Sequence, residues 1–546
     1  MDFFLRFVLV LLSFFVPFSF AGTLPWAFSV FQGGVCVLLA GILFSRRRVM
    51  ITPLFGPVLY VLGGLTLYSL VQCAATQTLL TQPAWYPATL MRLYTLEHAS
   101  YFITYLGWGF AVMQLIDTSK VSTRAVFWLG ICAVAVALSA LYLGKGEYIY
   151  TLTGVRGGFG PFLNRNHGGI FLAASTVLCL GWVCAAFIQP FEEPKDKKTF
   201  WVRQGWGLLA VLGLGAATVF SRSRGGMLSL AAGLFFLALS GALLIPSDWK
   251  KRLRYVSLVL VFFGGGACWA YTHLHAINTF AHRRNVHDTS VETRQMLYRA
   301  GAKILHDYPV WGIGVGALPV VVTSYMEKPL SAYVERLHSD WLEMLVGLGY
   351  VGGLLSAGGI VWFGLLLLRR LVHITPAKKI KLAAAGGAII TVCTGALVDF
   401  PFFIPGTALL FFWAVGLACS ASFWKERVHH YRLPVWVRVA VLVIGAAACI
   451  VPLQKTLAWR MFSFGRNLKT ESRLQYYQKG LSYYPGPRFA LRLGHEYYNA
   501  SLRTKDPAQQ ARLRELAHQT AAAYLKRYPQ EKELSRLYVR TRVADN

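Results

Sequence analysis

The sequence predicts an all-α, polytopic membrane helix bundle of about 12–13 spans with a small helical module at the C-terminal end. Two observations predict this fold class. Hydrophobic residues make up 55% of the 546 residues and charged residues only 14%, whereas a soluble domain carries about 25% charged residues. The apolar residues also form runs of about 20, the length that a helix needs to cross a bilayer. A disordered chain, a disulfide-rich miniprotein and an ordinary cytosolic enzyme are therefore excluded.

The spans can be located from the apolar runs themselves. About 13 are expected, at 3–21, 26–44, 54–73, 97–116, 125–143, 168–189, 204–220, 225–245, 255–272, 341–368, 382–398, 405–423 and 437–455. Residues 1–22 could instead be a cleaved signal peptide, because the first run ends in a small residue.

Basic clusters give the orientation, because positively charged connections stay in the cytoplasm. They fall on every second connection, at 46–48, 120–124, 195–198, 250–252, 369–379 and 425–432. The N-terminus is then cytoplasmic. The connections 74–96, 144–167 and 273–340 and the tail after 456 are expected outside. The cytoplasmic connections leave no room for a nucleotide-binding domain, so ATP-driven chemistry is not expected.

The net charge of +30, from 54 Lys and Arg against 24 Asp and Glu, concerns partners more than fold. The orientation of the spans explains the part of this charge that lies in the cytoplasmic connections. The outer basic residues are Arg156, Arg165, Arg222, Arg224, Arg283, Arg284, Arg294, Arg299, Lys303 and Arg336. Arginine near a membrane core is costly and often functional, and its guanidinium group binds phosphate through two hydrogen bonds. This distribution argues against nucleic acid and favours a lipid diphosphate, with lipid headgroups as the alternative ligand.

Two outer segments could hold such a ligand. The segment SRSRGG (221–226) breaks two spans, and its glycines, hydroxyls and following helix N-terminus suit a phosphate. Residues 290–306 predict an amphipathic helix with an apolar stripe of Met296, Leu297, Ala300 and Ile304. This helix could deliver Arg294 to a site or simply lie on the bilayer surface. The glycines at 312, 314 and 316 then predict a flexible turn.

His338, at the mouth of the span 341–368, is a candidate general base, because imidazole titrates near neutral pH. An interfacial histidine is the alternative. Glu343 lies on another face of the helix, and Asp340 is expected to cap it. The histidines at 273, 275, 282 and 287 lack metal-ligand spacing, and the nine cysteines all lie in apolar runs. No metal and no cofactor are therefore predicted.

Four segments in this order resemble the bacterial O-antigen ligase and polymerase superfamily of polytopic glycosyltransferases. They are FLNRNHGG (162–169), SRSRGG (221–226), YPVWGIGVG (308–316) and HSDWLEMLVGLG (338–349), and the resemblance covers roughly 150–420. It implies a metal-independent, inverting enzyme of the bacterial inner membrane, with a fold similar to the C-type glycosyltransferases. The implied donor is a glycan on undecaprenyl diphosphate on the periplasmic side. Ligases transfer it to lipid A–core, polymerases to another lipid-linked repeat, and protein O-oligosaccharyltransferases to Ser or Thr.

The resemblance also implies roles for particular residues. Arg222 or Arg224, together with Arg294, would bind the diphosphate, and His338 would activate the acceptor hydroxyl. Possible substrate-binding residues are Arg165, Asn166, His167, Arg299 and Glu343.

The tail differs from the rest of the chain, because 468–540 is polar and helical in pattern and resembles tetratricopeptide repeats. We therefore expect a transmembrane glycosyltransferase domain over 1–455 and a periplasmic module over 456–546. The module could dock a protein partner or the glycan, or it could cap the membrane domain. Ligase and polymerase activities remain open at this stage. A transporter or flippase of anionic lipid-linked glycans and a scaffold that acts through the tail are the alternatives from other classes.

Overall fold

The computed structural model describes residues 1–45, 48–75, 86–142, 158–188, 197–244, 253, 257, 289–328, 334–374, 376–421, 430–526, 528 and 532–542. Within this part of the chain the structure is almost entirely helical. Its strands are β1 (Val49–Met50) and β2 (His430–Tyr431), which pair antiparallel. The all-α prediction is confirmed.

The helices of the bundle lie over the predicted spans, with one exception. They are α1 (Asp2–Phe18), α2 (Pro25–Ser45), α3 (Gly56–Ala74), α4 (Arg92–Leu115), α5 (Ser119–Tyr142), α7 (Arg165–Ile188), α8 (Lys197–Phe220), α9 (Arg224–Leu244), α13 (Asp340–His373), α14 (Pro376–Val398), α15 (Pro405–Ala421), α16 (Val435–Ala448) and α17 (Ile450–Gly465). The exception is that α16 and α17 together cover the predicted span 437–455 and extend to Gly465. Short 3-10 turns lie at Phe20–Gly22, Pro53–Phe55 and Pro401–Phe403. The expected span 255–272 lies outside the described residues.

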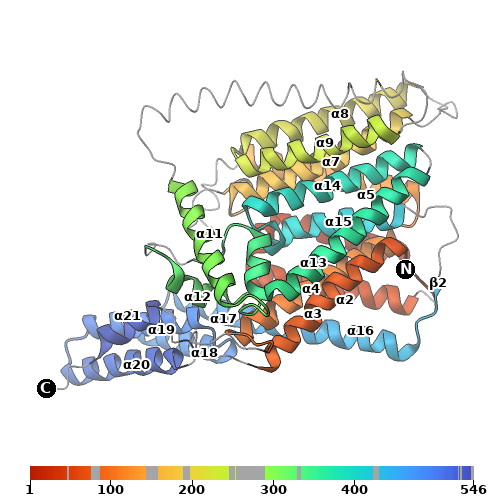
Figure 1. Ribbon diagram of the computed structural model, residues 1–546. Helices are drawn as coiled ribbons and strands as arrows, with labels where there is room; N and C mark the ends of the chain where they lie inside the picture. Colours follow the sequence, from red (N-terminus) through yellow and green to blue (C-terminus); the bar gives the residue numbers. More distant parts are fainter. Residues whose placement is uncertain are drawn as a thin grey trace.

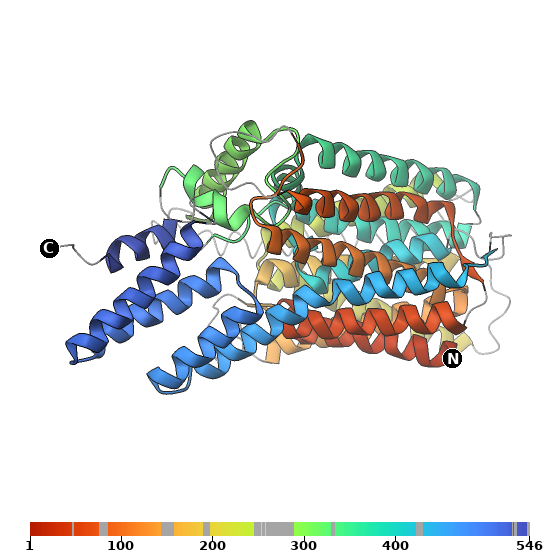
Figure 2. The ribbon, with the colours of Figure 1, turned by 90° about the horizontal axis from the view of Figure 1, so that it is seen from below.

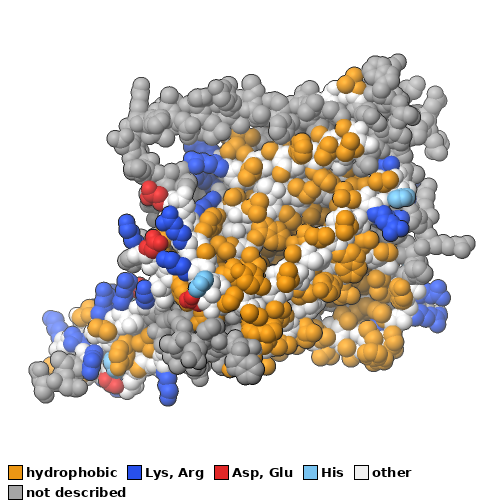
Figure 3. Space-filling view, in the orientation of Figure 1, with side chains coloured by type: hydrophobic (Ala, Val, Ile, Leu, Met, Phe, Trp, Pro, Cys, Tyr) orange, Lys and Arg blue, Asp and Glu red, His pale blue; other side chains and the backbone are white. Residues whose placement is uncertain are grey.

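Length and hydropathy identify this bundle as a membrane domain. In the described part of the chain, nine helical segments are long and apolar enough to cross a bilayer, and α15 is a shorter apolar helix. Helices α7 and α14 are mostly buried and pack against each other and against α9 at the centre of the bundle. Apolar side chains cover the outward face over α13, where Leu354 is 74% exposed (Figure 3). A water-soluble protein does not expose so large an apolar surface, so the protein is a multi-pass membrane protein.

Helix α1 is an integral part of this bundle. Its leucines Leu5 and Leu9 are buried in the main hydrophobic core. Trp413 donates a hydrogen bond from Nε1 to Ser13 Oγ at 2.9 Å. Arg6 pairs with Asp117 at 3.1 Å in the α4–α5 connection. These contacts hold α1 against α4, α5 and α15.

The bundle has two chemically different ends (Figures 1 and 2). At one end, which we call the basic end, β1 pairs with β2 and Lys381 donates a hydrogen bond to Ser119 Oγ at 2.8 Å. The other end, which we call the site end, carries α11 (Thr289–Asp307) and α12 (Leu318–Tyr325). The described parts of the basic connections, such as 120–124 and 369–374, belong to the first end, and the described parts of the predicted outside connections lie at the second.

Helix α11 confirms the helix that was predicted over 290–306. Leu297, Ala300 and Ile304 of the expected apolar stripe are buried, and Met296 is half-buried. The stripe packs against α12 and α13 rather than against lipid. The alternative of a plain helix on the bilayer surface is therefore wrong, because protein covers its apolar face.

The tail consists of α18 (Thr470–Tyr483), α19 (Pro487–Arg503), α20 (Pro507–Leu525) and α21 (Lys532–Thr541). Consecutive helices pack in antiparallel fashion around Phe462, Tyr477, Leu493, Tyr497 and Ala517 (Figure 2). Proline begins α19 and α20, a favoured position because no helical N–H is lost there. The module extends from the site end of the bundle.

Candidate functional site

A buried carboxylate forms the centre of the candidate site. Asp399 follows the last residue of α14 and is 1% exposed. Its Oδ1 lies 3.4 Å from His167 Nε2 and 3.5 Å from His338 Nδ1. Its Oδ2 lies 3.7 Å from Arg294 Nη2. Three residues that the sequence predicted separately thus meet around one acid that it did not predict.

Four different elements supply this cluster. His167 lies in the first turn of α7, Arg294 in α11 and His338 just before α13. The Phe400 ring packs edge-on against both imidazoles, with centroids 4.6 Å from His167 and 5.1 Å from His338. This ring shields the cluster on one side and restricts both imidazoles.

The charge of Asp399 is strongly stabilised. Burial alone would raise the pKa of this carboxyl group. The attraction and hydrogen bonding of His167, followed by those of His338, outweigh burial and hold the pKa well below its usual range. The Phe400 N–H also donates to Oδ1 at 3.0 Å. Asp399 is therefore an anion at physiological pH that can orient two imidazoles and attract a guanidinium group.

His338 has an unusual backbone. Its φ is +58°, which costs an L-residue about 1–2 kcal/mol. Tyr298 of α11 donates a hydrogen bond to the His338 carbonyl at 2.9 Å. The next residue, Ser339, caps α13 by accepting from Leu342 N at 3.4 Å. Such strain persists only where the surroundings fix it, and it is common at functional sites.

Asp340 does not have its expected role as the helix cap, because Ser339 occupies that position. Asp340 is fully buried and accepts from Phe402 N at 2.8 Å, while its own N–H donates to the Asp399 carbonyl at 3.1 Å. It therefore links the start of α13 to the end of α14, which brings His338 and Asp399 together.

Glu343 holds the segment before His338 rather than His338 itself. Its Oε1 pairs with Arg336 Nη1 at 2.6 Å, and its Oε2 accepts from Leu337 N at 3.1 Å. The Arg336 guanidinium stacks over Phe403 at 3.8 Å. Burial alone would lower the pKa of Arg336, but the charge of Glu343 outweighs it and raises the pKa. Arg336 is thus a fixed cation next to the candidate base.

The SRSRGG turn joins α8 to α9 and packs on the start of α7. Ser221 and Ser223 are buried, whereas Arg222 and Arg224 are exposed. A Cβ atom on Gly169 would lie 2.7 Å from Ser221 Oγ, so only glycine allows this approach. The turn also borders the end of α14, because a Cβ atom on Gly225 would lie 3.2 Å from Val398. Both arginines are therefore on the rim of the site end, near the buried cluster.

The turn at 308–316 is tightly packed rather than flexible, contrary to expectation. Gly312, Gly314 and Gly316 all have positive φ. Ile313 N donates to Val346 O at 3.0 Å, and Gly314 N donates to Gly347 O at 2.9 Å. These bonds join the third segment of the family resemblance to the fourth, which carries His338.

The remaining predicted residues lie farther out. Arg165 is exposed at the start of α7, where Asn164 Oδ1 accepts from Asn166 N at 2.9 Å. Arg299 is exposed and lies 3.7 Å from Glu327. The structure does not bring Arg299 into the Asp399 cluster.

In the described part of the chain, no group of three or more His, Cys, Asp or Glu is placed to hold a metal ion. The histidines at 273, 275, 282 and 287, together with Arg156, Arg283 and Arg284, lie outside the described residues.

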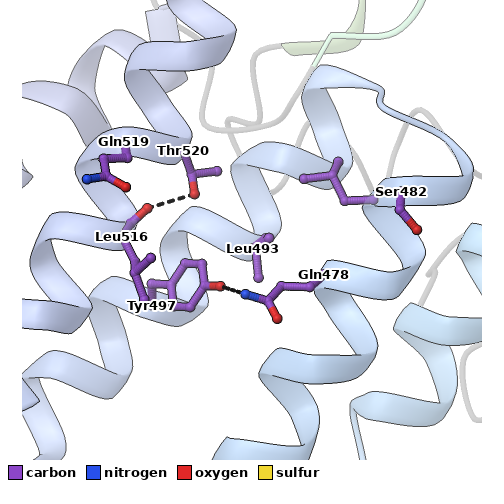
Figure 4. Close-up of a pocket in the computed structure, with 8 residues that line it drawn as sticks. Gln478, Ser482, Leu493, Tyr497, Leu516, Gln519 and Thr520 are labelled. Carbon is purple, nitrogen blue, oxygen red and sulfur yellow. Dashed lines mark hydrogen bonds between the residues drawn. The ribbon is translucent and has the colours of Figure 1, made fainter.

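A separate groove lies within the tail, away from His338. It has a volume of about 360 Å³ and is lined by side chains of α18, α19 and α20 (Figure 4). Gln478 donates a hydrogen bond to the Tyr497 hydroxyl across it, and Leu481, Leu493 and Leu516 form its apolar part. No charged side chain lines this groove.

Asp399 was missed at the sequence level, although one signal was available. It is a carboxylate at the outer end of an apolar span, and an acid beside a membrane core is costly unless it has partners or a function. Arg336 was counted among the outer basic residues, but its pairing with Glu343 could not be foreseen.

Comparison with known proteins agrees with the segments described above. No curated protein matches the chain. Residues 208–357, which include SRSRGG, α11, the glycine turn and His338, match the family described as O-antigen ligase. This match supports the resemblance to the O-antigen ligase and polymerase superfamily over that segment of a multi-pass membrane protein.

Proposed function

We propose that this protein transfers a glycan from undecaprenyl diphosphate to an acceptor hydroxyl on the periplasmic side of the bacterial inner membrane. The acceptor is lipid A–core in a ligase, or a growing polysaccharide in a polymerase. The observation that carries the proposal is the Asp399 cluster, in which His338, His167 and Arg294 meet at the site end. The O-antigen ligase match over 208–357 supports the reaction class.

The proposed donor brings its own activation. A glycosyl diphosphate contains its leaving group, so the reaction needs no ATP outside the cell. Arg222 and Arg224 on the rim, together with Arg294, supply guanidinium groups that suit a diphosphate. These groups would stabilise the negative charge that grows on the diphosphate as the glycosidic C–O bond breaks. Arg294 then has two anionic neighbours, the diphosphate and Asp399.

His338 is the proposed general base. Its Nδ1 faces Asp399, which leaves Nε2 to accept the proton of the acceptor hydroxyl. The acceptor oxygen attacks the anomeric carbon, and the diphosphate leaves with the bonding electron pair from the opposite side. One displacement of this kind inverts the anomeric configuration. Asp399 would stabilise the imidazolium group that forms, in the way an oriented carboxylate supports a catalytic histidine.

Two other functions use the same donor chemistry. A protein O-oligosaccharyltransferase would place a Ser or Thr hydroxyl where the glycan acceptor binds. A transporter or flippase would need the cationic rim but not the general base. The His338–Asp399–His167 arrangement favours an enzyme, since transport needs no residue that takes a proton from a hydroxyl group.

A deletion strain complemented with variants tests this proposal. We expect wild type to restore the surface polymer, and His338→Ala to reduce transfer by roughly 100- to 10,000-fold with normal amounts of folded protein. Arg222→Ala should also fail to restore it, by loss of diphosphate binding. Arg512→Ala, which changes an exposed arginine of α20 outside the cluster, serves as the matched arginine control. Full restoration of the polymer by both His338→Ala and Arg222→Ala would reject the mechanism.

The same deletion strain separates the two reaction types. Long polymer that remains on undecaprenyl diphosphate indicates a ligase, because polymerisation still occurs. Single lipid-linked repeats indicate a polymerase. Unmodified proteins with intact surface polysaccharide would instead favour protein glycosylation.

A further inference from the structure

The C-terminal module makes specific contacts with the part of the chain that carries His338. Glu97 of α4 is 3% exposed, and its carboxylate binds two residues from the C-terminal region. Lys455 Nζ of α17 lies 2.6 Å from Oε1, and the Tyr484 hydroxyl donates to Oε2 at 2.7 Å. Tyr101 donates to Oε1 at 3.1 Å. We call these four residues the Glu97 latch.

The latch continues directly to the segment before His338. His98, the neighbour of Glu97, has its Nε2 3.3 Å from Arg336 Nη1. Arg336 is fixed by Glu343, which also accepts from Leu337 N. Polar contacts therefore run from Tyr484 to Glu97 and from His98 to the residue that precedes the candidate base, and the adjacency of Glu97 and His98 in α4 joins the two sets.

Two further contacts join the module to this segment without passing through Glu97. Arg488 of α19 forms an ion pair with Glu335. Tyr528, which follows α20, packs on the hydrophobic cluster that contains Val334 and Leu337. The segment 334–337 thus has its polar and apolar sides fixed partly by the tail.

The free-energy cost of detachment indicates that the module stays docked. If it swung away, the buried Glu97 carboxylate would lose the Tyr484 hydroxyl that donates to Oε2, and a buried charged group that loses a hydrogen-bond partner is destabilised. Tyr484 is itself 1% exposed and would expose its ring. A detachable arm would not be attached through a buried hydrogen bond to a charged group.

We infer that the C-terminal module is a positioning element of the active site, which holds the segment 334–338 through the Glu97 latch and the Arg488–Glu335 pair. This inference rests on the proposed function of His338. The strained backbone of His338, with φ of +58°, is the reason that such support is needed. Lys455, Tyr484 and Arg488 then act through other residues and do not touch substrate.

The decisive experiment measures kcat and donor KM of the purified full-length enzyme with a lipid diphosphate-linked glycan. We expect Tyr484→Phe to lower kcat roughly tenfold or more, as expected for one lost hydrogen bond to a charged group, with donor KM within about twofold. Lys455→Met should lower kcat further, and Lys455→Arg should restore most of it. Tyr497→Phe is the matched control, because its hydroxyl bonds to Gln478 inside the module and not to the latch.

A charge exchange at the surface provides a second test, which does not depend on the folding of the latch variants. Arg488→Glu and Glu335→Arg should each lower kcat about threefold or more, and the double variant should recover at least half of the wild-type value. Arg536→Glu is the control, since Arg536 pairs with Glu533 at similar exposure on α21, away from the segment. These side chains are exposed, so the variants should fold normally.

The outcomes separate this inference from the proposed function. Wild-type kcat in folded Tyr484→Phe, or in both single charge variants, overturns the positioning role while His338→Ala still tests the mechanism. Loss of kcat without recovery in the double variant also argues against the Arg488–Glu335 contact. An active His338→Ala enzyme would instead reject the proposed role of His338 as the general base.

Discussion

Individual residues decide whether the candidate site can perform acid–base chemistry, and Asp399 is the most informative of them. The sequence predicted His338, His167 and Arg294 from local patterns and family resemblance. It could not predict that they meet, because they lie on α7, α11 and the start of α13, and the acid that joins them follows α14. Tertiary packing determines which ends of the spans become neighbours. Local sequence patterns do not show this.

Asp399→Asn tests the central residue with little change of volume. Transfer should fall by roughly 10- to 1,000-fold, because the neutral amide no longer orients or stabilises the His338 imidazolium. The matched variant is Asp307→Asn, which changes an exposed acid at the end of α11. A measured rate near wild type in Asp399→Asn would show that His338 works without this carboxylate.

The depressed pKa of Asp399 also predicts a pH dependence of stability. A carboxyl group whose pKa is lower in the folded state stabilises the fold fully above its unfolded pKa of about 3.9, and this contribution is lost as the pH falls further. Thermal unfolding in detergent should therefore show Asp399→Asn less stable than wild type at neutral pH. The difference should shrink below about pH 4. A difference that is constant with pH would contradict the charged, stabilised state of Asp399.

At the scale of elements, the sequence predicted the helices whose apolar length or hydrophobic periodicity is visible in the local sequence. The spans and α11 were predictable because apolar length and a 3.6-residue period are local properties. The interruption of α13 was not. Gly349 has φ +63° and ψ −169° inside this helix, where the chain passes the backbone of Val310 and Gly312. A glycine in an apolar run gives no sign of such a close approach.

Gly349→Ala should disrupt the junction between the glycine turn and α13. An added Cβ atom would lie 2.2 Å from the Val310 carbonyl oxygen, and the backbone conformation itself costs a non-glycine residue about 1–3 kcal/mol. We expect a clear fall in the thermal midpoint in detergent and reduced transfer, since His338 begins the same helix. Gly358→Ala in α13 is the control, because nothing lies within 4 Å of its Cβ position. Equal midpoints for the two variants would contradict this account of the kink.

At the scale of the whole molecule, the bundle separates its charges between two ends. Charged side chains of α11 and the tail gather at the site end in Figure 3, while apolar side chains cover the bundle between the two ends. The structure supports the cap interpretation of the tail through the Glu97 latch, although the sequence left partner docking and capping open. Repeat-like periodicity predicts helices that stack on one another, but it says nothing about the surface to which they attach.

Orientation in the membrane is the last property to test, because it decides whether a periplasmic donor can reach His338. The positive-inside rule predicts that the basic end faces the cytoplasm and the site end the periplasm. Arg512→Cys on the exposed surface of α20 should react with a membrane-impermeant maleimide in intact spheroplasts. Arg432→Cys, exposed beside β2 at the basic end, should react only after permeabilisation. Unsubstituted protein gives the background, since its nine cysteines lie in apolar runs. The reverse labelling pattern would place the site in the cytoplasm and exclude the proposed transfer, whatever the chemistry of the Asp399 cluster.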